Sequence, residues 1–161
     1  MVVQRLPAWF ANFIARPRVS LIALNLATVI DRPLMRVSGG RLRLSFIVPV
    51  MLLRCRGART GALREVPLLY TPDGEDALLV ASNGGQATRP AWCYNLRAHP
   101  EVSALMNGQN LSLRATELSG SERERAWHVA VTLYPGFARY AERVADPLPV
   151  FRLSPIAAGQ S

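Results

Sequence analysis

Apolar and polar positions alternate between strand-like and helix-like patterns along most of the chain. Short runs rich in β-branched and other apolar residues, bounded by Gly, Pro, Asn and Asp, are typical of strands. They predict strands at residues 44–53, 64–71, 77–81, 102–106, 109–117 and 148–153. Pro72-Asp73-Gly74 and Asn107-Gly108 supply turn residues for tight hairpins between neighbouring strands.

Helix-like stretches stand between the later strands. Pro90 suits the first turn of a short helix that ends at His99-Pro100. Ser119 and Ser121 are each followed three residues later by Glu, which makes both capping-box candidates for a longer helix. Residues 137–144 predict a last helical segment.

Two further helices are predicted at the N-terminus, at residues 8–15 and 19–30. The second is apolar nearly all round. It either packs against the rest of the protein or contacts a membrane surface, since several arginines flank both helices.

Short hairpins with one helix between the strand pairs favour a mainly β fold with flanking helices (α+β), closed into a small split β-barrel. We therefore divide the chain into a helical N-terminal extension at residues 1–36 and a barrel domain at residues 37–156. The 161-residue length suits one such domain, and half of the residues are hydrophobic, enough for a core without disulfides.

Composition excludes several classes of site. Cys55 and Cys93 lie in unrelated segments without a CxxC motif, and only His99 and His128 could join them, so we expect no disulfide framework and no metal site. No nucleophile elbow or HExxH pattern points to hydrolysis. No stretch of about 18 apolar residues indicates a membrane-spanning helix, and no secretory signal stands out. We expect a cytoplasmic protein, in which any association with a membrane would be made by the N-terminal helices.

The positive charge is concentrated in the first half of the chain. Residues 1–64 hold 11 Arg and one acidic residue, whereas residues 65–161 hold 8 Arg and 10 acidic residues. A basic half suits an anionic ligand or an anionic surface. Nucleic acid is excluded as a partner because no binding motif accompanies the charge.

Candidate chemistry gathers between residues 57 and 97. Arg59 and Arg64, with the Gly-rich turn 57–61, form a candidate anion clamp, because guanidinium groups and bare backbone N–H groups bind phosphate. The second Gly-rich turn, 81–85, can approach an anion or a flat ring closely. Trp92 and Asn95 lie three apart on the short helix and face the same side. Together they predict a pocket for a large, anionic, partly aromatic small molecule.

These motifs and their order resemble the deazaflavin-dependent nitroreductase family. The resemblance is carried by Gly57-x-Arg59-Thr60-Gly61-x-x-Arg64, Val66-Pro67-Leu68-Leu69-Tyr70, Ala81-Ser82-Asn83-Gly84-Gly85, Pro90-x-Trp92-x-x-Asn95-Leu96-Arg97-x-x-Pro100 and Leu133-Tyr134-Pro135. Members of that family bind coenzyme F420 in a split β-barrel of the FMN-binding type. The resemblance covers roughly residues 37–153, most of the chain.

The resemblance implies a set of site residues. Those that would bind the cofactor are Arg59, Thr60, Gly61, Arg64, Pro67, Leu69, Ala81, Ser82, Asn83, Gly84, Gly85, Ala91, Trp92 and Asn95. Tyr134, Phe137 and Tyr140 would cover the cofactor and bind the substrate. Phe137 has no hydroxyl group to donate, so Tyr134 is the first candidate proton donor, with Tyr140 second and Ser82 as a further catalytic candidate. Ala58 stands where relatives carry a basic residue.

The function implied by the resemblance is oxidoreduction. A hydride would pass from reduced coenzyme F420 to a small-molecule electron acceptor such as a quinone, an enone or a nitroaromatic. Two alternatives stay open: the same barrel binding a flavin, and a non-catalytic protein that carries the cofactor. The expected assembly is a monomer or a homodimer.

Overall fold

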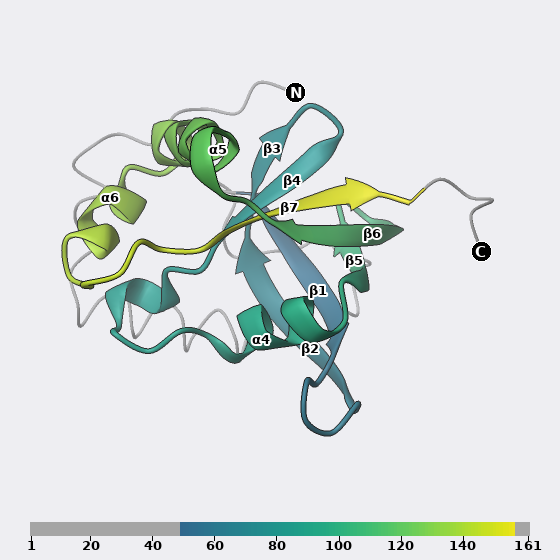
Figure 1. Ribbon diagram of the computed structural model, residues 1–161. Coiled ribbons are helices and arrows are strands. Elements are labelled where there is room, and N and C mark those ends of the chain that lie inside the picture. The colour runs from purple at the N-terminus through teal and green to yellow at the C-terminus, as the bar shows by residue number, and fades with distance from the viewer. Residues whose placement is uncertain (1–48, 157–161) are drawn as a thin grey trace.

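Antiparallel strands form one seven-stranded sheet in the computed structural model, which describes residues 49–156 of the chain (Figure 1). The strands are β1 (Val50–Arg56), β2 (Leu63–Leu69), β3 (Thr71–Asp73), β4 (Asp76–Val80), β5 (Glu101–Met106), β6 (Gln109–Glu117) and β7 (Val150–Pro155). Their order across the sheet is β2-β1-β5-β6-β7-β4-β3. The pairs β1–β2, β3–β4 and β5–β6 are hairpins.

A bend at Tyr70 forces the sheet to close. β2 and β3 stand at opposite ends of the strand order, yet only Tyr70 separates them in the chain. One residue spans at most about 3.6 Å, so the sheet curls until its two ends approach each other. The N–H of Tyr70 donates to the carbonyl of Pro49 (3.0 Å), which holds the bend against the chain that enters β1. The predicted mainly β, split-barrel fold is confirmed.

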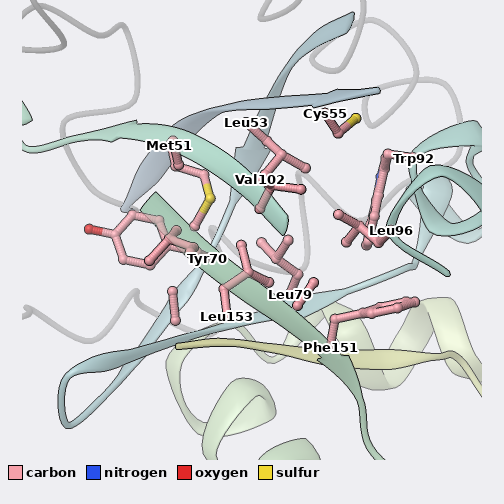
Figure 2. Close-up of a cluster of buried hydrophobic side chains, with 14 of the residues drawn as sticks. Met51, Leu53, Cys55, Tyr70, Leu79, Trp92, Leu96, Val102, Phe151 and Leu153 are labelled. Carbon is pink, nitrogen blue, oxygen red and sulfur yellow. The ribbon is translucent and has the colours of Figure 1, made fainter. Parts of the chain in front are cut away.

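The inside of the barrel is filled by alternate residues of each strand. Met51, Leu53 and Cys55 of β1 point inward and are almost completely buried. Figure 2 shows side chains of several strands meeting there, with Trp92 entering from a helix. The rings of Trp92 and Phe151 pack edge to face with centroids 5.6 Å apart. Other members of this cluster are Tyr70, Leu79, Leu96, Val102 and Leu153.

Helices cover the outside of the described barrel. They are the 3₁₀ turn η2 (Asn83–Gly85), α4 (Ala91–Ala98), α5 (Gly120–Leu133) and α6 (Gly136–Ala141). α5 packs Ala126 and Ala130 into a second apolar cluster that also contains Leu78 and Val80 of β4. Because Leu79 of the same strand faces the barrel interior, both faces of β4 are buried, which explains its unbroken apolar run.

Some predicted elements lie outside the described residues. These are the helices at residues 8–15 and 19–30, the extension at residues 1–36 and the first half of the strand predicted at 44–53. No helix within residues 49–156 is long and apolar enough to cross a membrane.

Other element predictions need correction. The strand predicted at residues 64–71 is two strands, because Tyr70 turns the chain from β2 into β3. Pro72 lies in edge strand β3 and not in the turn, as suits a residue without an N–H to donate. Ser119 is the N-cap of α5 but makes no side-chain capping hydrogen bond, so the capping box does not form there. The last helix, α6, ends at Ala141, earlier than predicted.

We predict that shortening one inward side chain of β1 costs much more stability than shortening an outward one of β2. Leu53 is fully buried, whereas Leu63 is 73% exposed. Leu53→Ala should lower the free energy of unfolding by about 2–5 kcal/mol because it leaves a cavity, and Leu63→Ala should change it by less than about 0.5 kcal/mol. Urea titrations of both variants measure this. Equal losses would contradict the described core.

Candidate functional site

A cavity of about 290 Å³ lies beside β2. Its walls come from the second half of β2, the end of β4, the η2 turn and the loop after it, the start of α4, and α6. The lining residues are Val66, Pro67, Leu68, Leu69, Leu79, Val80, Ser82, Asn83, Gly84, Gln86, Pro90, Trp92 and Phe137. Mostly apolar walls with a few polar groups are typical of small-molecule sites.

The cavity borders the open edge of β2. Residues 66–69 all line it. Successive residues of a strand point to opposite faces, so four in a row can reach one cavity only where it meets the backbone edge. β2 is the first strand in the sheet order, so that edge has no strand partner in the described fold. Pro67 is tolerated there because an edge position does not require its N–H.

The η2 turn is built from left-handed backbone conformations. All three of its residues have positive φ, at 43°, 66° and 79°. Asn83 Nδ2 donates to the carbonyl of Thr88 (2.9 Å), so this amide also holds the loop that follows. A Cβ on Gly85 would lie 3.0 Å from Cδ1 of Tyr140, so glycine lets α6 approach the turn. The turn thereby joins one wall of the cavity to α6.

Asn95 fastens the basic turn between β1 and β2 to α4. Its Oδ1 accepts a hydrogen bond from the N–H of Ala58 (2.9 Å), and its Nδ2 donates to Sγ of Cys55 (3.6 Å). Inside the turn, the N–H of Gly61 donates to the carbonyl of Gly57 (2.8 Å). Since α4 also contributes two cavity residues at its start, one helix positions both the cavity wall and the basic turn.

Three arginines project from this hairpin without an acidic partner. Arg56, Arg59 and Arg64 are exposed, and none of them forms an ion pair or side-chain hydrogen bond within residues 49–156. Arg54, on the same hairpin, differs because its Nε donates to Oε1 of Glu65 (2.8 Å). Figure 1 shows the loop between β1 and β2 projecting away from the rest of the sheet. The hairpin therefore presents uncompensated positive charge to a ligand.

The aromatic residues of α6 and the segment before it form a packed group. Tyr134 and Phe137 rings meet edge to face at 5.1 Å between centroids, and the hydroxyl oxygens of Tyr134 and Tyr140 are 3.2 Å apart. Burial, followed by the hydrogen bond to Tyr140, raises the pKa of Tyr134 well above its ordinary value. Phe137 lines the cavity, whereas the two tyrosines do not.

The cysteines are packing residues. Burial raises the pKa of Cys93 to about 12, and burial also raises that of Cys55, where the hydrogen bond from Asn95 acts in the opposite direction. Both side chains are therefore protonated thiols at neutral pH. Within residues 49–156, no group of three His, Cys, Asp or Glu side chains is arranged to hold a metal ion.

Comparison with known proteins identifies the family. The model of the F420H(2)-dependent quinone reductase family matches residues 28–155, which include the whole cavity and the basic turn. The chain belongs to this family. The quinone reductase match confirms the F420-dependent part of the sequence resemblance, which had been to the related nitroreductases.

Individual members of the family are similar over most of their length. An F420H(2)-dependent quinone reductase of Mycobacterium tuberculosis (strain ATCC 25618 / H37Rv) is 30% identical over 124 residues, which are 74% of this chain and 83% of the relative. A solved structure of an F420-H2 dependent reductase (FDR-A) is 36% identical with a TM-score of 0.62, covering 66% of this chain and 94% of that one. Another, described as a domain-swapped dimer, is 31% identical with a TM-score of 0.64, covering 78% and 96%.

The structure brings seven of the 17 sequence-predicted site residues to the cavity. The predicted residues that line it are Pro67, Leu69, Ser82, Asn83, Gly84, Trp92 and Phe137. Those on neighbouring positions that do not line it are Ala81, Gly85, Ala91, Asn95, Tyr134 and Tyr140. Arg59, Thr60, Gly61 and Arg64 form the separate basic hairpin at the other end of β2.

Several lining residues were missed in the sequence. They are Val66, Leu68, Leu79, Val80, Gln86 and Pro90. The family resemblance implied only Pro67 and Leu69 of β2, whereas the open edge of this strand also brings Val66 and Leu68 to the cavity. Gln86 directly follows one family motif and Pro90 begins the next, and those positions were the available signal for both.

We predict that the Asn95 side chain stabilises the folded protein through its hydrogen bond to the basic turn. Asn95→Ala removes the part-buried hydrogen bond from the N–H of Ala58 and truncates a side chain that is itself buried, which should lower the free energy of unfolding by about 1–3 kcal/mol. Asn110→Ala is the control, because Asn110 is an exposed partner of Arg54, and it should cost less than about 0.5 kcal/mol. Urea unfolding compares them; an Asn95→Ala variant as stable as the control would refute this role.

Proposed function

We propose that this protein transfers a hydride from reduced coenzyme F420 to a quinone. The observation that supports this best is the pairing, within the family-matched region, of an apolar cavity at an open strand edge with an uncompensated basic hairpin. The two features suit a ligand with a flat aromatic end and an anionic end. α4 holds them together on one side of the barrel.

The residues present fit the cofactor. Pro67, Leu69 and the 81–85 turn would border its ring, because there the backbone edge and the left-handed turn allow close approach. Trp92 would border the ring from α4, whereas Ala91 and Asn95 of the same helix do not line the cavity and Asn95 holds the basic turn beside it. The anionic tail of the cofactor would lie against the basic hairpin, on Arg59, Thr60, Gly61 and Arg64. When bound, reduced coenzyme F420 supplies the hydride.

The protein's own contribution is to bind, orient and keep water out. Leu68, Trp92 and Phe137 wall the cavity with apolar surface, which excludes water and strengthens the polar contacts that remain. Ser82 is a hydroxyl-bearing residue of that wall. We assign its hydroxyl the role of hydrogen-bonding the acceptor oxygen on which negative charge develops.

Acceptors other than quinones remain within the same proposal. Enones and nitroaromatics are also electron-poor and flat, and the cavity lining does not distinguish them by charge. A quinone is preferred because the matched family and its members carry that activity in their names.

The oligomeric state of the protein and its contact with a membrane also stay proposals. The first is a homodimer, supported by a solved relative described as a domain-swapped dimer. The second is peripheral membrane contact through residues 1–36, whose arginines and apolar helix pattern support it.

The experiment that tests the function has two parts. Titration of the purified chain with coenzyme F420 and with flavin mononucleotide at equal salt should show tighter binding of the deazaflavin. Stopped-flow mixing of the reduced-cofactor complex with a quinone should then show rapid oxidation. Tighter flavin binding would identify a flavin protein, and tight deazaflavin binding without oxidation by any quinone, enone or nitroaromatic would identify a carrier.

We predict that the basic hairpin contributes to cofactor affinity. A hydrogen bond to a charged group contributes about 1.5–3 kcal/mol, so Arg64→Ala and Arg59→Ala should each weaken cofactor binding by about tenfold or more. The loss should shrink at high salt, where the wild-type interaction is already screened. Fluorescence titration measures both.

The matched control for these variants is Arg114→Ala. Arg114 is an exposed arginine of β6 that pairs with Glu101 (2.7 Å), outside the hairpin. Its removal should leave the dissociation constant unchanged. If both hairpin variants bind the cofactor as tightly as this control does, the hairpin does not hold the anionic tail.

A further inference from the structure

Two buried tyrosine hydroxyls are hydrogen-bonded to each other next to the cavity. Tyr134 and Tyr140 are each 5% exposed, and their oxygen atoms are 3.2 Å apart. Among the described residues, neither hydroxyl has another hydrogen-bond partner. One hydroxyl donates and the other accepts, so both oxygen atoms take part in a hydrogen bond in a place where an unpaired hydroxyl would be costly.

The pair sits in a segment with little room to move. A Cβ on Gly136 would lie 2.5 Å from Cζ of Tyr134, so the glycine is packed directly against that ring. On the other side, the ring of Tyr140 lies against Gly85 of the η2 turn, where an added Cβ would be 3.0 Å away. The hydroxyl pair therefore ties the segment before α6 to the end of α6, while glycines let both rings pack closely.

Phe137 lies between the two tyrosines in the chain and is the member that reaches the cavity. Its N–H donates to the carbonyl of Tyr134 (3.1 Å). Its ring meets those of Tyr134 and Tyr140 edge to face, with centroids 5.1 Å and 6.5 Å apart. The orientation of the Phe137 ring in the cavity wall therefore depends on where the two tyrosines hold α6.

We propose that Tyr134 and Tyr140 are a positioning pair that fixes Phe137 in the cavity wall, so that Phe137 sets which acceptors fit and neither tyrosine donates a proton. This proposal rests on the proposed function, since it concerns the acceptor of that reaction. It replaces the sequence-based expectation that Tyr134 is the proton donor. In this arrangement the acceptor receives a hydride from the reduced cofactor and a proton from water.

The decisive experiment compares single and double tyrosine variants. Tyr134→Phe and Tyr140→Phe each leave one buried hydroxyl unpaired, so each should lower kcat/KM for a bulky quinone by about threefold to tenfold. The double variant removes both hydroxyls and should regain most of that loss. If one of the hydroxyls donates the proton, removing it should lower kcat/KM by about 10²-fold, and the double variant should show the same loss.

A second arm tests the role of Phe137. Phe137→Ala should raise kcat/KM for a naphthoquinone relative to a benzoquinone by about tenfold, because the cavity wall recedes. Phe137→Leu, which keeps more of the packing, should shift the same ratio in the same direction by less. Thermal melting confirms that each variant is folded, and the Leu variant decides the matter if the Ala variant is not.

Tyr94→Phe is the control for all tyrosine variants. Tyr94 is 51% exposed on α4 and belongs neither to the tyrosine pair nor to the cavity lining. The Tyr94→Phe variant should therefore keep the wild-type kcat/KM for the bulky quinone and the wild-type preference between the two quinones. The proposal is overturned if the double variant stays as slow as Tyr134→Phe, or if both Phe137 variants keep the wild-type preference. Failure of the proposed function would look different, because even the wild-type chain would then fail to oxidise the reduced cofactor with any of the quinones.

Discussion

The site depends on one topological constraint, the bend at Tyr70 between two strands at opposite ends of the sheet order. The bend requires the sheet to curl, and curling buries both faces of β4 against different clusters. It also leaves β2 with an open backbone edge, since β3 continues into the far end of the sheet and does not pair with β2. The cavity lies along that edge. A flat ring can be reached there by backbone groups that would be occupied in a fully closed barrel.

The site also depends on α4. The helix lines the cavity with Pro90 and Trp92 near its start, and one turn later Asn95 bonds the basic hairpin. Trp92 is also locked into the core by Phe151. The relative position of the cavity and the basic hairpin is therefore set by packing in the barrel and by one buried amide. Binding sites held by rigid elements lose less freedom when a ligand binds.

The sequence predicted the fold class and most of the strands because each hairpin carries local turn residues, of which Asn107-Gly108 is an example. It did not predict the break of residues 64–71 into two strands, because the closure at Tyr70 is a property of the whole sheet. For the site, motif resemblance found the η2 turn, Trp92 and Phe137. It could not show that the hydroxyl groups of Tyr134 and Tyr140 face each other, since spacing along the chain fixes neither ring orientation nor burial.

The ion pairs of the described fold show where its positive charge is balanced and where it is not. Along the sequence, a basic first half suits an anionic ligand, a membrane or a solvated surface equally well. In the described fold, the arginines at positions 97, 114, 123 and 125 each lie within 2.7 Å of a carboxylate oxygen, which offsets their charge locally. Arg56, Arg59 and Arg64 instead gather on one projecting hairpin without such partners among residues 49–156. Because surface charges act over about one Debye length of roughly 8–10 Å, the uncompensated charge is felt mainly at that hairpin, which is fixed to the cavity helix by Asn95. A ligand with an aromatic end and an anionic end therefore meets two complementary surfaces that the same helix holds in place.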